Sequence, residues 1–265
     1  MSLPTIVPEE RRIFLEFFAA GVNNEMLVES VKKNLFIDEY TMDPKILTNL
    51  LSERRRTPSA MTTLEQSGSS QSLIFMFPFG FTATKIDDDD CPAVLDHFIT
   101  SNRATANANF YVFCLNSNEN NMTNPDPKDT MLSNANPNMF HYYYVAQFEE
   151  LHAIYLDDDP DSQFCIYKSQ RIFCIKTYFP FHDFYFSILS KILEQMRSRK
   201  NDVLSEMMTN YEQSLGQLDM VDGEFGLGTL ENEIFPVLEQ LLNHKLDNNL
   251  TSYEEIGNEM IGYDI

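Results

Sequence analysis

The residues that could do chemistry in this chain are mainly carboxylates and histidines, and they gather at two places. Asp87 to Asp90 form a run of adjacent carboxylates, and carboxylate oxygens are calcium ligands. An EF-hand loop, however, takes its oxygens from alternating positions and needs a glycine at its sixth position and a glutamate at its twelfth. The run has none of these features, so it predicts a solvated acidic turn.

The second group follows a strand-like segment. Glu149, Glu150 and His152 are residue types that bind metal ions, and they lie close together in the sequence. Successive side chains of a strand point to opposite faces, so the two glutamates are poorly placed to share one ion. The pattern favours the polar end of a strand, and we assign no metal site here.

Covalent catalysis has no recognisable motif in this chain. There is no nucleophile elbow, Walker loop, His-Glu-x-x-His pair or kinase signature. The histidines show no recognisable pairing with a cysteine or serine, and they are His97, His141, His152, His182 and His244. The cysteines lack short paired spacings, which favours reduced thiols, and they are Cys91, Cys114, Cys165 and Cys174. We expect a binding protein with no catalytic residue and no cofactor.

The charge balance argues against nucleic acid as a partner. The net charge is −21, whereas phosphate contacts rest on clustered Lys and Arg. An anionic membrane surface is disfavoured for the same reason. Arg54 to Arg56 stand beside a polar stretch and predict a loop edge, and Gly223 to Gly228 has neither the dinucleotide nor the P-loop spacing. Residues 201–265 hold 1 basic and 14 acidic side chains, which predicts a solvated acidic region.

Length and hydropathy favour one soluble domain. At 265 residues and 43% hydrophobic content, the chain can bury a sizeable core in a single domain with appendages. No run approaches the roughly 18 apolar residues of a membrane helix. Glu9 to Arg12 are charged where a signal peptide would be apolar. We therefore expect a cytoplasmic protein.

The elements that must position any site are organised around Gln170 to Met196. Ile172 to Lys176 is a short apolar run rich in strand formers, and Pro180 cannot continue it as a central strand. Beyond Pro180 the apolar residues take the spacing of one helix face, at 181, 184, 185, 188, 189, 192, 193 and 196. The segment predicts a buried strand, a proline turn and a core-facing helix.

The remaining pattern predicts further strands and helices on either side of this segment. Strands are predicted at Arg12 to Ala20, Ser72 to Phe79, Asn109 to Leu115, His141 to Phe148 and Phe164 to Tyr167. Helical segments are predicted from Asn23 or Asn24 to Leu35, over Ile46 to Leu51, over Val203 to Leu218 and from Pro236 to Leu246.

Polar stretches divide the chain. We expect an N-terminal extension at 1–11, a module at 12–246 and an acidic tail at 247–265. Within the module, segments near 53–72 and 116–137 are rich in Ser, Asn, Asp, Gly or Pro and predict disordered insertions.

In their order, these segments resemble the upstream, longin-like module of the DENN domain family. The matching features are Phe14 to Gly21, Phe77-Pro78-Phe79-Gly80, Phe110 to Phe113, Tyr142 to Glu149, and the segment from Ile172 through Leu193-Glu194-Gln195-Met196. The resemblance spans about residues 12 to 246. The chain departs from the family at Thr177, Tyr178 and His182, where Ser, Arg and Phe are usual.

The resemblance implies an α+β fold, a five-stranded antiparallel sheet of longin type flanked by helices, with the Pro180 helix the principal one. The residue pattern adds acidic helices at the C-terminal end, which the resemblance does not explain. The resemblance also implies a regulator of membrane traffic, the longin-like part of a Rab GTPase guanine nucleotide exchange factor, weak or inactive without the remaining DENN modules. The alternative is a longin-like scaffold or adaptor subunit that pairs with a partner longin domain. Either protein would be cytoplasmic and would reach endomembranes through its partners.

Overall fold

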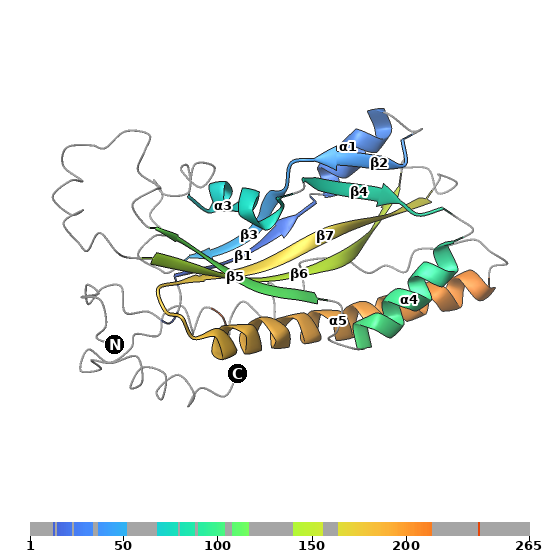
Figure 1. Ribbon diagram of the computed structural model, residues 1–265. Helices are drawn as coiled ribbons and strands as arrows, with labels where there is room; N and C mark the ends of the chain where they lie inside the picture. Colours follow the sequence, from blue (N-terminus) through green and yellow to red (C-terminus); the bar gives the residue numbers. More distant parts are fainter. Residues whose placement is uncertain are drawn as a thin grey trace.

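A curled antiparallel sheet of seven strands carries helices on both faces (Figure 1). The structure, a computed structural model, describes residues 13, 15–22, 24–33, 37–51, 68–78, 80–87, 90–103, 108–116, 140–155, 164–213 and 238. Its strands are β1 (Glu16–Gly21), β2 (Glu39–Met42), β3 (Lys45–Leu51), β4 (Phe81–Lys85), β5 (Ala108–Asn116), β6 (Phe140–Tyr155) and β7 (Phe164–Thr177). Its helices are α1 (Asn24–Lys33), α3 (Gly68–Met76), α4 (Cys91–Arg103) and α5 (His182–Gln213).

Strand β7 is the centre of the sheet. One of its edges pairs with β6, which in turn pairs with β5. The other edge is shared, because β4 pairs with β7 as far as Ser169 and β1 pairs with it from Ile172 onward. Gln170 and Arg171 lie between the two pairings, so the sheet forks at this point. The antiparallel sheet is confirmed, but it has seven strands where five were expected. Strands β5-β6-β7-β1-β3 follow one another, and β4 and β2 extend the sheet from the first part of β7.

The segment from Ile46 to Leu51, predicted to be helical, is part of strand β3. Each residue of β1 from Glu16 to Gly21 has a partner on β3. The register shifts between Ala19 and Ala20, whose partners are Thr48 and Ile46, so Leu47 is the extra residue of a bulge. The helix-like spacing of this segment does not decide its structure, because the buried strand β1 needs hydrogen-bond partners along its second edge. Strand β3 supplies them.

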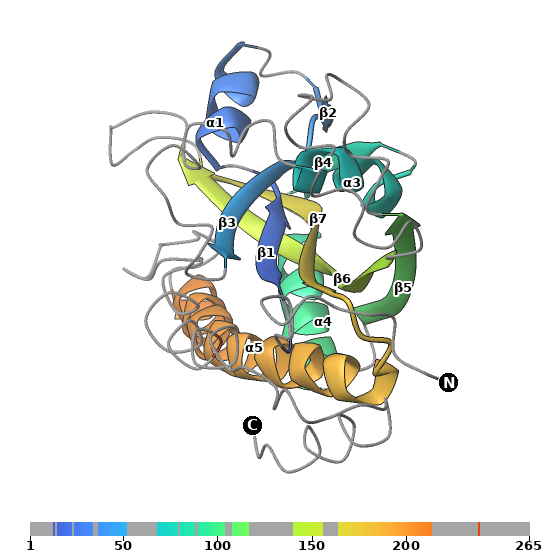
Figure 2. The same ribbon diagram turned by 90° about the vertical axis from the view of Figure 1, so that its left-hand side faces the viewer.

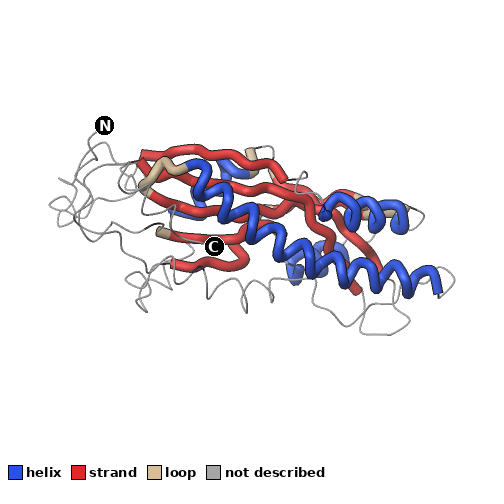
Figure 3. Tube along the Cα trace, turned by 90° about the horizontal axis from the view of Figure 1, so that it is seen from below, coloured by secondary structure: helices blue, strands red, loops and turns tan. Residues whose placement is uncertain are grey.

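Helices α5 and α4 lie on one face of the sheet and α1 and α3 on the other (Figures 2 and 3), and a hydrophobic layer covers each face. Phe17 and Phe173 pack against helix α5, whereas the neighbouring Phe18 and Cys174 face the layer that contains α1 and α3. This is the alternation that a strand buried on both faces requires. The α5 residues in the first layer are Tyr185, Ile188, Leu189, Ile192, Leu193 and Met196, at the spacing that the sequence predicts.

The long β6–β7 ribbon twists between its ends. Tyr167 is on the same side of β7 as Phe173 by alternation, yet it packs with Leu27 and Val31 of α1 rather than with α5. Ile166, from the other side of the strand, packs with Leu95 of α4. One side of the ribbon therefore faces α5 at one end and α1 at the other.

Most predicted strands and the principal helix are confirmed. The first strand is β1, the strands at 109–115 and 141–148 are β5 and β6, and the two strands before Pro180 are one strand, β7. The first predicted helix is α1, which starts at Asn24. The Pro180 helix is α5, and it continues to Gln213 to include the first part of the helix predicted from Val203.

Two predictions near α3 are wrong. Ser72 to Phe79, predicted as a strand, lies largely in helix α3, which also includes residues 68–72 of the predicted insertion. Helix α4 was not predicted, although Asp90 and Pro92 form a helix start. Residues 1–11, 53–67, 117–137 and 247–265 lie outside the described residues. Leu238, from the segment predicted to close the module, is buried in the α5 layer.

None of the described helices is long and apolar enough to cross a membrane.

Candidate functional site

The two adjacent glutamates at the end of β6 point to opposite faces of the sheet, as strand alternation predicts. Glu149 is exposed, and its carboxylate lies 3.3 Å from Nζ of Lys168. Glu150 is 3% exposed and faces the interior. The expectation that the two do not share an ion follows from this geometry. Among the described residues, no three His, Cys, Asp or Glu side chains come together as metal ligands.

The buried face holds a polar cluster at the fork of the sheet, formed by Glu150, His152, Ser169 and Arg171, which we name the fork cluster. The Arg171 guanidinium pairs with Oε2 of Glu150. Nε2 of His152 lies 3.8 Å from the same carboxylate oxygen and 2.7 Å from Oγ of Ser169. All four residues are at most 5% exposed.

The fork cluster does not have the geometry of a Ser-His-Glu triad. In such a triad the carboxylate and the nucleophile engage different ring nitrogens of the histidine, so that the carboxylate holds the tautomer that accepts the proton. Here Glu150 and Ser169 both approach Nε2, and Arg171 neutralises the carboxylate. We interpret the cluster as a structural ion pair.

Gly21 shows how closely the chain packs at the fork. A Cβ atom on Gly21 would lie 3.2 Å from the carbonyl oxygen of Gln170 and 3.6 Å from Nε of Arg171. The end of β1 therefore passes Arg171 at a distance that leaves little room for a side chain.

Helix α3 presents two apolar side chains to the outside. Leu73, Met76 and Phe77 are buried at i, i+3 and i+4, whereas Ile74 is 72% exposed and Phe75 is 56% exposed. We name this pair the α3 ridge. Large exposed apolar side chains side by side are typical of protein-binding surfaces.

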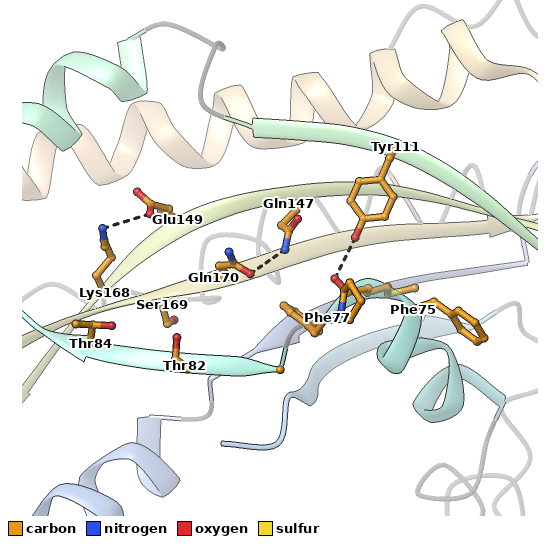
Figure 4. Close-up of a pocket in the computed structure, with 13 residues that line it drawn as sticks. Phe75, Phe77, Thr82, Thr84, Tyr111, Gln147, Glu149, Lys168, Ser169 and Gln170 are labelled. Atoms are coloured by element: carbon orange, nitrogen blue, oxygen red, sulfur yellow. Dashed lines mark hydrogen bonds and ion pairs between the residues drawn. The ribbon is translucent and has the colours of Figure 1, made fainter. Parts of the chain in front are cut away.

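A cleft of about 480 Å³ lies on one side of the α3 ridge (Figure 4). Phe75 and Phe77 line its apolar end, and the strands supply the polar end. In the polar end, Nε2 of Gln147 donates to Oε1 of Gln170 at 2.8 Å, next to the Lys168–Glu149 pair. The cleft thus has an aromatic end and an end with amides and charges.

Tyr111 connects two of the elements that line the cleft. Its hydroxyl donates a hydrogen bond to the carbonyl oxygen of Met76 at 3.2 Å, which joins strand β5 to helix α3. Burial raises the pKa of Tyr111 to about 12, with a smaller contribution from Cys174. The ring therefore stays neutral and keeps its donor throughout the physiological range.

A larger groove of about 980 Å³ lies on the other side of the α3 ridge. Leu73, Ile74 and Phe77 form one wall, and residues 41–49 of β2, β3 and their connection line the groove as well. The ridge therefore stands between two concave surfaces. An apolar centre with a rim of amides, hydroxyls and charges is the usual composition of a non-obligate protein interface.

The sequence did not identify this surface, because a strand over Ser72 to Phe79 would have buried Ile74 or Phe75 on one of its faces. A signal was present, since Leu73, Met76 and Phe77 have the spacing of a helix face. The fork cluster was missed for a different reason. Ser169 and Arg171 belong to the polar stretch Lys168 to Arg171 between two apolar runs, and nothing in the sequence pairs them with Glu150.

The other candidate residues have structural surroundings. The backbone N–H of Asp90 donates to the carbonyl oxygen of Asp87 at 3.0 Å, which confirms the acidic turn. His141 stacks on Tyr178 with ring centroids 4.8 Å apart. Cys165 and Cys174 are buried and form no disulfide, and burial raises the pKa of Cys174 well above its ordinary value. Arg54 to Arg56, Gly223 to Gly228 and His244 lie outside the described residues.

Comparison of the chain with protein-family models, with curated proteins and with solved structures finds no match.

Proposed function

We propose that the chain is a DENN-type regulator of membrane traffic, the longin-like part of a Rab GTPase exchange factor, and that it acts by binding without covalent chemistry. The observation that carries the proposal is the α3 ridge between two concave surfaces, on one face of an antiparallel sheet. The order of the family-like sequence segments supports it, as does the helix that begins after Pro180 and covers the opposite face.

Such a regulator works through differential affinity. A ligand shifts a conformational equilibrium only by as much as it binds one state better than the other. By binding the nucleotide-free GTPase and holding the switch segments away from the phosphate and magnesium site, the regulator lowers the affinity for GDP. This requires an interaction surface and no catalytic group.

The α3 ridge is the part of this surface that we expect to contact the GTPase. Ile74 and Phe75 supply apolar area, and the Lys168–Glu149 pair lies in the adjoining cleft where it can orient a partner. Apolar contacts at the centre of an interface contribute most of the binding energy.

Binding of purified Rab proteins to the immobilised chain, measured in the nucleotide-free and GDP-bound states, tests the proposal. We expect preferential binding of the nucleotide-free form by at least one Rab. Ile74→Asp should weaken that binding by about tenfold or more. Ile37→Asp is the matched control, because Ile37 is also exposed, at 41%, but lies outside the α3 ridge. The absence of binding to any Rab in either state would overturn the proposal.

Release of labelled GDP from the same Rab panel tests the strength of exchange. If residues 12–246 are a longin-like module of this family, the remaining DENN modules would supply much of the GTPase contact, so we expect slow release or none from these 265 residues. Fast release by this chain alone would contradict the expectation of weak exchange, and it would not change the result of the binding test.

A second candidate is a longin-like scaffold or adaptor subunit that pairs with another longin domain. The uncharged edge of strand β5, which no second strand of the described residues pairs with, favours this function, because unpaired strand edges are sites of sheet extension. A stable complex that forms equally well in the presence of any nucleotide would favour the scaffold, and preference for a nucleotide-free GTPase would favour the regulator.

A further inference from the structure

The described sheet has three strands that pair on one side only, and they differ in how their free edges are protected. Strand β2 has four residues and carries Glu39. Strand β3 follows Pro44, begins with Lys45 and contains the bulge at Leu47. Short length, charge, proline and bulges are the usual devices that prevent an edge from pairing with another chain.

Strand β5 has none of these devices. It pairs with β6 in unbroken register over nine residues, from Ala108 opposite Phe148 to Asn116 opposite Phe140. Its sequence, Ala-Asn-Phe-Tyr-Val-Phe-Cys-Leu-Asn, contains no charge and no proline. In the described part of the chain, no second strand pairs with it. A long, regular and uncharged edge is the kind that accepts another strand.

The two faces of β5 are both apolar and both incompletely covered. Phe110 packs against the α5 layer, with its ring centroid 6.0 Å from that of Phe186. Phe113 packs on the other face, stacked on Tyr143 at 4.9 Å and 5.9 Å from Phe75. Phe110, Tyr111, Val112 and Phe113 nevertheless remain only half-buried. An added strand would complete the burial on both faces.

We propose that the free edge of β5 pairs with β5 of a second copy of this chain, in an antiparallel homodimer with one continuous sheet. A strand that fits must be uncharged and apolar on both faces, because both hydrophobic layers border the edge. The described chain offers one open strand with these properties, which is β5 itself. The strand that best fits beside β5 is therefore β5 of a second copy.

The symmetry of such a dimer determines which side chains meet. If the two-fold axis passes through Val112, Tyr111 lies opposite Phe113 of the second copy, and Phe110 lies opposite Cys114. Aromatic and aliphatic cross-strand pairs of this kind stabilise sheets. Although each chain carries a net charge of −21, the paired strands bring no charged side chain against another. The inference does not depend on the exchange function, and the α3 ridge is not part of the test.

Sedimentation of the full chain over a range of concentrations tests the dimer. We expect the wild type to form dimers as the concentration rises. Cys114→Lys should raise the dimer dissociation constant by at least tenfold, because Cys114 is exposed on β5 and a charged lysine on an edge strand disfavours pairing with another strand. Thr41→Lys places the same charge on the exposed side of edge strand β2 and should leave the dimer intact. Cys114→Ser should also dimerise, which excludes a disulfide as the cause.

Amide hydrogen exchange locates the interface. Exchange along β5 should slow as the protein concentration rises, while exchange along β2 and β3 stays constant. A protein that is monomeric at every concentration overturns the proposal. In that case slow exchange of the β5 amides would mean that another segment of the same chain covers the edge, and fast exchange would mean that the edge is free. A dimer that Cys114→Lys leaves unchanged, or one whose concentration-dependent amides lie in β3, also overturns it.

Discussion

At the scale of single residues, the fork cluster buries an ion pair in the interior. Glu150 and Arg171 are charged side chains at 3% and 5% exposure. Removing two charges from water costs several kcal/mol each, and their attraction in the interior offsets this only when the geometry is good. The pair is therefore weak evidence for added stability. Breaking it, however, leaves one uncompensated charge in the core.

Removing the negative charge should be far more damaging at Glu150 than at its neighbour. We expect Glu150→Gln to lower the free energy of unfolding by about 3–5 kcal/mol, because Arg171 stays buried without its counter-charge. Glu149→Gln should cost less than about 1 kcal/mol, because Glu149 and Lys168 are half-exposed. Urea unfolding of both variants measures the difference.

A double variant distinguishes the cost of an unpaired buried charge from the contribution of the ion pair itself. Glu150→Leu combined with Arg171→Met removes both charges at similar volume, and it should recover much of the stability that Glu150→Gln loses. Equal effects of the two single glutamate substitutions would show that the fork cluster is not energetically distinct from a surface ion pair.

Buried tyrosines give the protein a predictable alkaline limit. Burial raises the pKa of Tyr111 from 10.0 to about 12, and burial also raises the pKa values of Tyr144 and Tyr167. Because the unfolded chain ionises first, the stability due to these neutral rings is present below about pH 10 and is lost as the pH rises through the folded pKa values.

Urea midpoints measured between about pH 8 and pH 12 should therefore fall above about pH 10. Tyr111→Phe should flatten part of this decline, because phenylalanine cannot ionise. At neutral pH the variant should lose about 1 kcal/mol, since the hydrogen bond to Met76 is absent. A midpoint that stays constant up to pH 12 would contradict the assignment of neutral buried tyrosines.

At the scale of elements, a hydrogen-bond network fixes the turn between β7 and α5. Oγ1 of Thr177 donates to the carbonyl oxygen of Ile13 at 2.9 Å, lies 2.9 Å from the hydroxyl of Tyr185 and accepts from the backbone N–H of Phe179 at 3.1 Å. Tyr144 donates to the carbonyl oxygen of Phe179. The Thr177 hydroxyl therefore both donates and accepts hydrogen bonds in this turn.

Thr177 allows a matched pair of substitutions at a site with 0% exposure. Thr177→Val has nearly the same shape but no hydroxyl, so several buried partners lose a hydrogen bond. We expect it to lower the free energy of unfolding by about 1–3 kcal/mol. Thr177→Ser keeps the hydroxyl and should cost clearly less. Thermal and urea unfolding give the comparison, and a loss for Thr177→Ser as large as that for Thr177→Val would show that the hydroxyl contributes no more than the methyl group does.

The elements that the sequence predicts well are those whose pattern agrees with their burial. Helix α5 is amphipathic because one face meets the sheet, and β5 and β6 are bounded by polar residues. Ser72 to Phe79 is different, because its apolar residues are consecutive and fit a strand as well as a buried helix. The segment forms helix α3 rather than a strand because the helix buries Leu73, Met76 and Phe77 together. Ile74 and Phe75 then lie at the surface.

The candidate surface was less predictable than the fold. Exposure of Ile74 and Phe75 depends on which side of α3 meets the sheet, and that is decided by tertiary packing. The fork cluster depends on a strand pairing that joins residues about twenty positions apart, Glu150 opposite Ser169. Alternation correctly placed Glu149 and Glu150 on opposite faces, because that rule is local.

At the scale of the whole molecule, the sheet has a strongly and a weakly attached part. Strands β6 and β7 pair over fourteen residues, from Tyr142 opposite Thr177 to Tyr155 opposite Phe164. Strand β4 pairs with β7 over only three, Ala83 to Lys85, and β2 pairs with β4 alone. Leu27 and Val31 of helix α1 share a hydrophobic cluster with Tyr40 of β2 and Ala83 of β4, and α1 also contacts β6. The fork at Gln170 and Arg171 separates the two parts.

This division predicts that α1, β2 and β4 can open without unfolding the rest. Leu27→Ala creates a cavity under α1 at a cost of about 2–5 kcal/mol. It should speed amide exchange in α1, β2 and β4, while amides of β1, of α5 and of the Ile172–Lys176 part of β7 keep their protection. Leu189→Ala, at the centre of the α5 layer, should instead speed exchange in every element. If Leu27→Ala speeds exchange equally throughout, the fork does not divide the sheet, and the molecule unfolds as one cooperative unit.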